Sequence, residues 1–133
     1  MTAELSILRA DYADPRQAEA VVALLDAYAR DPMGGGEPLP ALARAELPAR
    51  LSQIPGAFSL LAYLAGVPVG LVNCFEGFST FACRPLLNVH DLAVLPAWRG
   101  RGIGRALLAR VETIARERDC CKLTLEVLQG NCL

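Results

Sequence analysis

The sequence predicts an α/β (α+β) fold in which one sheet is covered by helices. An apolar run at residues 86–95, a glycine-rich turn, an amphipathic helix and a β-rich run at 121–128 follow in the order of a strand–helix–strand unit. Two more β-rich runs, 58–65 and 67–75, are separated by Gly66 alone, which is typical of a tight hairpin. With 133 residues the chain is long enough for one domain with its own core, so we expect residues 1–133 to form a single domain.

The N-terminal elements carry clear boundary signals. Residues 5–9 alternate well enough to form a first strand. Asp14 can cap a helix that has Pro15 at its first position, and Pro32 should follow the end of that helix. The apolar face of this helix would consist of Ala18, Val21, Val22, Leu25 and Tyr28.

The middle region is expected to contain two irregular segments and one short helix. Residues 33–40, rich in Gly and Pro, are either a flexible connector or an acceptor-site loop beside the first helix. Residues 42–51 predict a short helix that Pro48 weakens. Residues 76–85 predict a loop whose two aromatic rings and two hydroxyls could line a pocket or pack as a hydrophobic loop.

Composition excludes several classes of protein. The net charge is −1, so nothing global favours nucleic acid as a partner. No apolar run approaches the roughly 20 residues of a membrane span, and the N-terminus lacks the pattern of a signal peptide, so we expect a soluble cytoplasmic protein. The five cysteines lack a CxxC spacing and the chain has one histidine, so we expect buried free thiols and no metal.

The glycine-rich turn is suited to phosphates. Residues 99–110 contain four arginines and no acid, although a solvated arginine-rich helix start would look similar. Glycines let a ligand approach the unpaired N–H groups at a helix N-terminus, where the helix dipole favours an anion. The helix that follows has one apolar face for packing on the sheet, formed by Ile103, Leu107, Val111 and Ile114.

Three phosphate-binding motifs were compared with the turn. A dinucleotide fingerprint requires G-x-G-x-x-G, whereas Gly100, Gly102 and Gly104 form G-x-G-x-G, and the Gly-Lys-Ser/Thr of a Walker A loop is absent. The third motif is R/Q-x-x-G-x-G/A after a strand of the form L-A-V-x-P, and residues 92–104 match it.

On these residues the chain resembles the GNAT superfamily of acyl-CoA-dependent N-acetyltransferases. The resemblance implies a mixed, mostly antiparallel sheet with a central parallel strand–helix–strand unit that binds CoA, and helices on both faces. It also implies that acetyl-CoA is the co-substrate, that the backbone of residues 92–94 pairs with pantetheine, and that the Val94 N–H stabilises the oxyanion of the tetrahedral intermediate. By position, the CoA-binding residues would be Leu92, Ala93, Val94, Arg99, Gly100, Arg101, Gly102, Ile103, Gly104, Arg105 and Asn131.

Two residues could take the proton that an amine must lose before it attacks. Strand alternation would place Leu86, Asn88, His90, Leu92 and Val94 on one face. His90 matches a histidine that acts through water in some members of the superfamily, or it is a core histidine satisfied by a neighbour such as Asp91. Glu126 shares a strand face with Lys122 and Thr124. It matches a glutamate that serves as base in members acetylating protein N-termini, or it is a solvated carboxylate.

The sequence departs from the superfamily pattern after Asn131, because the usual tyrosine-bearing helix and last two strands would follow there. The sequence is then either a shortened form, or completed by a partner chain, or impaired; an unfinished sheet edge would favour pairing with a second chain, such as a homodimer. The main functional hypothesis is direct transfer of acetyl from acetyl-CoA to a primary amine on an unknown small-molecule or protein acceptor. The alternative is a non-catalytic CoA-binding or interaction module, and a nucleotide-binding Rossmann domain is more distant.

Overall fold

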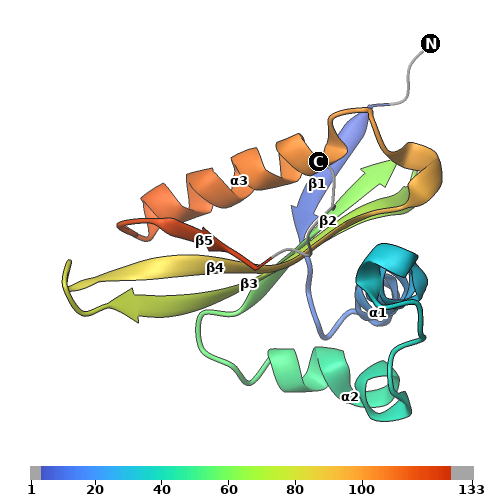
Figure 1. Ribbon diagram of the computed structural model, residues 1–133, viewed down its shortest axis with the longest axis horizontal. Coiled ribbons are helices and arrows are strands. Elements are labelled where there is room, and N and C mark those ends of the chain that lie inside the picture. The colour runs from blue at the N-terminus through green and yellow to red at the C-terminus, as the bar shows by residue number, and fades with distance from the viewer. Residues whose placement is uncertain (1–3, 127–133) are drawn as a thin grey trace.

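The computed structural model describes residues 4–126, which form a five-stranded sheet with helices on both faces (Figure 1). The strands lie in the order of the chain, and every neighbouring pair is antiparallel except the last, which is parallel. The strands are β1 (Leu5–Arg9), β2 (Phe58–Leu64), β3 (Val67–Ser79), β4 (Arg84–Val94) and β5 (Leu123–Leu125). The helices are α1 (Pro15–Arg30), α2 (Ala41–Leu51) and α3 (Ile103–Glu117), with short 3-10 helices at Pro32–Gly34 and Pro96–Trp98.

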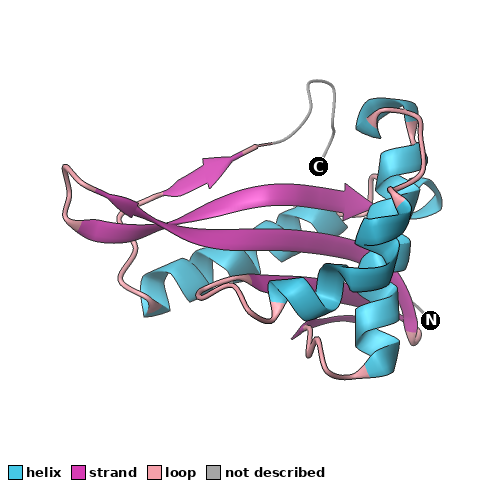
Figure 2. Ribbon diagram, turned by 90° about the horizontal axis from the view of Figure 1, so that it is seen from below, coloured by secondary structure: helices cyan, strands magenta, loops and turns pink. Residues whose placement is uncertain are grey.

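The two helical layers bury separate apolar cores against the sheet. Helix α3 covers one face and packs Ile103, Leu107 and Val111 onto the sheet, as the sequence predicts. Helix α1 covers the other face with Val21 and Leu24, and α2 lies beside it (Figure 2). The expected α/β fold with a mixed, mostly antiparallel sheet and a parallel β4–α3–β5 unit is therefore confirmed.

Helix α1 begins after the cap residue Asp14, with Pro15 at its first position, as the sequence predicts. The carboxylate of Asp14 accepts hydrogen bonds from the N–H groups of Arg16 at 2.9 Å and Gln17 at 3.3 Å, which satisfies two of the donors at the start of the helix. Helix α2 tolerates Pro48 inside its last turns. Part of the segment expected to be irregular forms the 3-10 helix that follows α1.

The expected loop at residues 76–85 is wrong, because the β3–β4 hairpin continues through most of it. Strand β3 runs to Ser79 and β4 begins at Arg84, so only a tight turn remains. Phe78 and Phe81 are 59% and 104% exposed near the hairpin tip, so they neither line a pocket nor pack as a hydrophobic loop. Strand pairing satisfies the backbone here although the side chains face solvent.

A β-bulge at His90 changes which β4 residues share a face. Asn73 pairs with Asp91 and the next residue of β3, Cys74, pairs with Val89, so His90 has no partner on β3. The expectation that Asn88, His90, Leu92 and Val94 alternate on one face is therefore wrong. An extra residue reverses the alternation beyond it, and the residues on the α3 side are Leu87, Val89, Leu92 and Val94.

Candidate active site

The turn before α3 exposes the start of the helix. Gly100 and Gly102 have φ angles of 79° and 81°, a left-handed backbone that glycine adopts without strain. Gly102 is the N-cap and supplies no side chain to bond the N–H groups of the first turn. A Cβ at either glycine would meet no atom within 4 Å, so the space above the turn is open. This geometry suits a pyrophosphate, because the helix dipole and the uncapped donors favour an anion.

The three arginines expected to bind CoA have different environments. Arg99 donates from Nε to the carbonyl oxygen of Val94 and forms an ion pair with Asp31, both at 3.0 Å. The guanidinium of Arg101 lies over the ring of Trp98, 4.9 Å from its centroid. Arg105 lies exposed in the first turn of α3. Arg99 therefore joins the end of α1 to the end of β4, whereas Arg101 and Arg105 are the cations at the open turn.

The end of β4 directs alternate N–H groups to its outer edge. The N–H of Leu95 donates to the carbonyl of Val69 at 2.9 Å, and Val94 lies opposite Gly70. In an antiparallel ladder this arrangement makes Val94–Gly70 a pair without mutual hydrogen bonds, so the Val94 N–H points away from β3. By the same alternation the backbone groups of Leu92 point outward and those of Ala93 point toward β3.

The two predicted proton acceptors lie together on the opposite side of the sheet from α3. His90 Nδ1 is 3.1 Å from Glu126 Oε2, and the imidazole also meets the ring of Phe75 edge-on. Parallel pairing of β5 with β4 produces the contact, because the N–H of Glu126 donates to the carbonyl of Val89 at 2.8 Å. His90 is therefore not a core histidine satisfied by Asp91. It is half-exposed and paired with the other candidate.

A cavity of about 370 Å³ lies beside this pair, between β3, β4 and the segment from α1 to α2. Its polar lining comes from Asn73, His90 and Asp91, and Gly34 belongs to its wall, so part of the segment at residues 33–40 does border a pocket. The bulge is what brings His90 and Asp91, successive residues, to the same cavity.

A buried chain of hydrogen bonds holds Asp91 in place. The Tyr12 hydroxyl and Ser59 Oγ are 2.8 Å apart, Ser59 Oγ donates to Asn73 Oδ1, and Asn73 Nδ2 donates to Asp91 Oδ2 at 3.1 Å. Ser59 is fully buried, and burial raises the pKa of Tyr12, so this hydroxyl remains a proton donor. Sequence reasoning assigned no role to Tyr12, Ser59 and Asn73. The available signal was the pair of polar residues, Ser59 and Asn73, inside two apolar runs.

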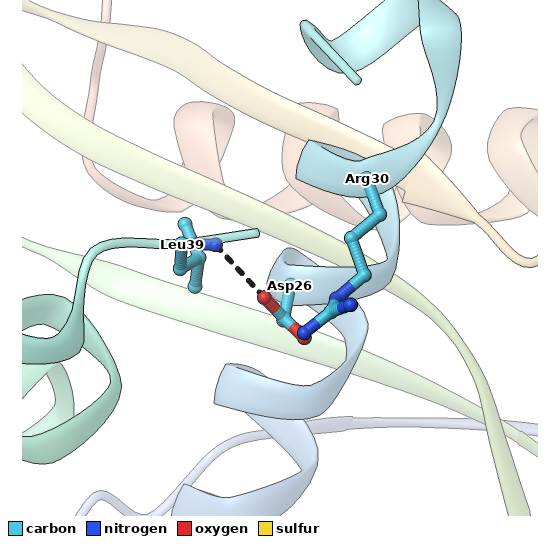
Figure 3. A network of polar contacts seen from close by, with 3 residues as sticks. All are labelled: Asp26, Arg30 and Leu39. Carbon is cyan, nitrogen blue, oxygen red and sulfur yellow. Dashed lines mark hydrogen bonds and ion pairs between the residues drawn. The ribbon is translucent and has the colours of Figure 1, made fainter. Parts of the chain in front are cut away.

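The outer wall of the cavity is fastened to α1 by Asp26 (Figure 3). Its carboxylate accepts from the backbone N–H of Leu39 at 2.9 Å and from Arg30 at 2.8 Å. The N–H of Leu39 and the guanidinium of Arg30, in that order, lower the pKa of Asp26 below its usual value. The carboxylate is therefore charged near neutral pH and ties the segment before α2 to α1.

The remaining predictions concern Asn131, the cysteines, and metal and membrane binding. Asn131 lies outside the described residues, as does Cys132. No cluster of three or more potential metal ligands occurs in residues 4–126, and no helix in that span is long and apolar enough to cross a membrane. Of the described cysteines, Cys74 is buried, Cys83 is exposed, and Cys120 and Cys121 are partly exposed, so the expectation of buried thiols holds for Cys74 alone.

An uncapped, glycine-rich turn after a strand with outward N–H groups is the arrangement of a βα phosphate-binding site. The model of the acetyltransferase (GNAT) family matches residues 18–132, and the chain belongs to that family. Streptothricin acetyltransferase from Streptomyces lavendulae is 38% identical over 68 residues, which cover 49% of this chain and 36% of that protein. The chain spans between 36% and 42% of the length of the curated relatives that it matches.

Solved structures share the fold. Ribosomal-protein-alanine N-acetyltransferase from Brucella melitensis biovar Abortus 2308 superposes with a TM-score of 0.76 at 24% identity, covering 96% of this chain and 82% of that one. Aminoglycoside N-acetyltransferase AAC(6')-Iy in complex with CoA has a TM-score of 0.75 at 19% identity, covering 98% and 82%. At these identities the likeness establishes the fold alone.

Proposed function

We propose that the protein transfers the acetyl group of acetyl-CoA to a primary amine by direct attack. The observation that carries the proposal is the arrangement along β4. His90, paired with Glu126, borders the cavity, the outward N–H of Val94 lies further along the strand, and the open turn of α3 follows. One strand and its turn thus supply a proton acceptor, a donor for an oxyanion and a phosphate site.

The residues at the turn fit the pyrophosphate of CoA. The space above Gly100 and Gly102 is empty of protein atoms, and Arg101 and Arg105 add positive charge. Pantetheine would extend along the outer edge of residues 92–94, while the backbone of Ala93 bonds within the sheet. Arg99 uses Nε and one Nη2 donor to bind Val94 and Asp31, which holds its guanidinium at the end of β4 beside the turn and leaves further N–H groups for a phosphate.

The chemistry requires a neutral amine. An alkylammonium first gives one proton to His90, and Glu126 stabilises the resulting imidazolium. His90 and Val94 are four residues apart, which in a strand is about 13 Å, so the proton passes through water. The amine nitrogen then bonds to the thioester carbon, and the Val94 N–H stabilises the oxyanion. The C–S bond breaks, and the thiolate takes the second proton of the nitrogen to give the amide and CoA.

Calorimetry with acetyl-CoA tests the binding step, and thiol release across a panel of amines tests transfer. We expect His90→Gln to lower kcat/KM by about 10²- to 10⁴-fold, the usual contribution of a general base, with little change in the Kd for acetyl-CoA. Glu112→Gln, which removes an exposed acid from α3, serves as a control and should leave both unchanged.

The alternative module without catalysis predicts a different result. A pure CoA binder would give heat on calorimetry and no thiol release with any amine. An unaltered kcat/KM in His90→Gln would remove this residue from the mechanism.

A further inference from the structure

We infer that the amine acceptor is a monoamine on an apolar body, such as an arylalkylamine, bound through its ammonium group at Asp91. This inference rests on the proposed function and specifies its substrate class. The cavity, at about 370 Å³, lies in the usual range for sites that bind small molecules. Most of its lining is aliphatic or aromatic, contributed by Leu25, Tyr28, Leu39, Leu47, Leu51 and Phe75.

Asp91 supplies the anionic contact. One of its oxygens accepts from Asn73, whose amide orientation follows from the hydroxyl that Ser59 donates to its carbonyl. Within residues 4–126, no Lys, Arg or His forms an ion pair with Asp91. A carboxylate fixed in direction at an apolar cavity gains most from a ligand cation, because the cation replaces the water that binding displaces.

The other acids near the cavity are already paired. Asp26 binds Arg30, Asp31 binds Arg99, and Glu126 binds His90. A polycationic acceptor would find one carboxylate in the cavity lining, that of Asp91, and would press its remaining ammonium groups against the apolar wall. An amine with a single charge and a hydrocarbon body meets neither difficulty.

The position of Asp91 beside His90 links binding to reaction. The bulge turns these successive residues to the same cavity, so Asp91 captures the ammonium on the His90 side of the cavity, and the water that carries its proton to the imidazole occupies the same space. Asp91 thus captures the amine before it is acetylated at the end of β4.

The test compares four probes on the protein saturated with CoA. Calorimetry should give 2-phenylethylamine a Kd at least tenfold below those of 2-phenylethanol, spermidine and kanamycin. With acetyl-CoA, thiol release should follow the same order in kcat/KM. Asp91→Asn should raise the KM for 2-phenylethylamine at least tenfold, change kcat less, and leave the KM for acetyl-CoA within twofold.

A second variant tests the apolar wall without touching Asp91. Leu47→Glu places a new carboxylate in the cavity and should tighten kanamycin binding several-fold while weakening 2-phenylethylamine. Leu42→Glu, at a 55% exposed position of the same helix, should change neither and is the control.

The outcomes separate this inference from the proposed function. Tighter binding of kanamycin or spermidine than of 2-phenylethylamine overturns the substrate class, even if these amines are acetylated. Binding of 2-phenylethylamine that is insensitive to Asp91→Asn overturns the role of Asp91. If the monoamine binds as expected but no amine is acetylated, the cavity assignment stands and acetyl transfer fails.

Discussion

Gly102 and Gly66 form a matched pair that isolates the contribution of the turn to acetyl-CoA binding. Their φ angles are 81° and 79°, and a Cβ at either residue would meet no atom within 4 Å. Alanine at either position should lower the free energy of unfolding by about 1–2 kcal/mol, since an L-residue is strained in the left-handed region. Gly66 lies in the β2–β3 turn, whereas Gly102 caps α3.

Gly102→Ala should also weaken acetyl-CoA binding, because its methyl group would occupy part of the open space above the turn where the pyrophosphate is proposed to lie. Loss of one hydrogen bond to a charged group costs about 1.5–3 kcal/mol, which corresponds to an increase in Kd of about 10- to 150-fold. Backbone strain present in both free and bound protein cancels in the Kd, so Gly66→Ala should bind normally.

Urea denaturation and calorimetry measure the two quantities separately. The reasoning is refuted if Gly102→Ala binds acetyl-CoA within twofold of the unaltered protein, or if Gly66→Ala weakens binding equally. A loss of stability far above 2 kcal/mol in Gly66→Ala would contradict the strain estimate.

Three further predictions concern the fold. Leu107→Ala should lower the free energy of unfolding in urea by about 2.7–5 kcal/mol because Leu107 is fully buried, whereas Leu42→Ala, at an exposed position, should stay within about 0.5 kcal/mol. Because the pKa of Asp26 lies below its usual value near 4, its contribution to stability is complete above that value and disappears as the pH falls through the lowered one. Asp26→Asn should therefore flatten the fall in melting temperature on acidification below about pH 4. Burial raises the pKa of the Cys74 thiol to about 12, so at about pH 8 an alkylating reagent should label exposed Cys83 and reach Cys74 only in denaturant, as mass spectrometry of digests would record.

Local signals predicted the parts of the fold that depend on neighbours in the chain. Asp14 and Pro15 mark the start of α1, and the three- and four-residue spacing from Ile103 predicts the face of α3 that packs on the sheet. The glycine turn was also predicted, since positive φ and an uncapped helix are properties of the local sequence.

Features set by strand pairing were not predictable in the same way. The alternation of β4 looks continuous in the sequence, but its register with β3 includes an extra residue at His90. Nothing local to His90 or Glu126 indicates that they meet, because their contact follows from the parallel register of β5. The Tyr12–Ser59–Asn73–Asp91 chain likewise joins four segments that only the assembled sheet brings together.

The bulge lets β4 carry a catalytic residue without disturbing the alternation of its core residues. If His90 is removed from the sequence of β4, the residues that pack toward α3, namely Leu87, Val89, Leu92 and Val94, fall into strict alternation. The strand thus carries a regular core pattern interrupted by a single inserted residue, and that residue is the proposed proton acceptor. Insertion or deletion of the single codon for His90 would therefore add or remove the proposed proton acceptor while the core residues of β4 keep their register.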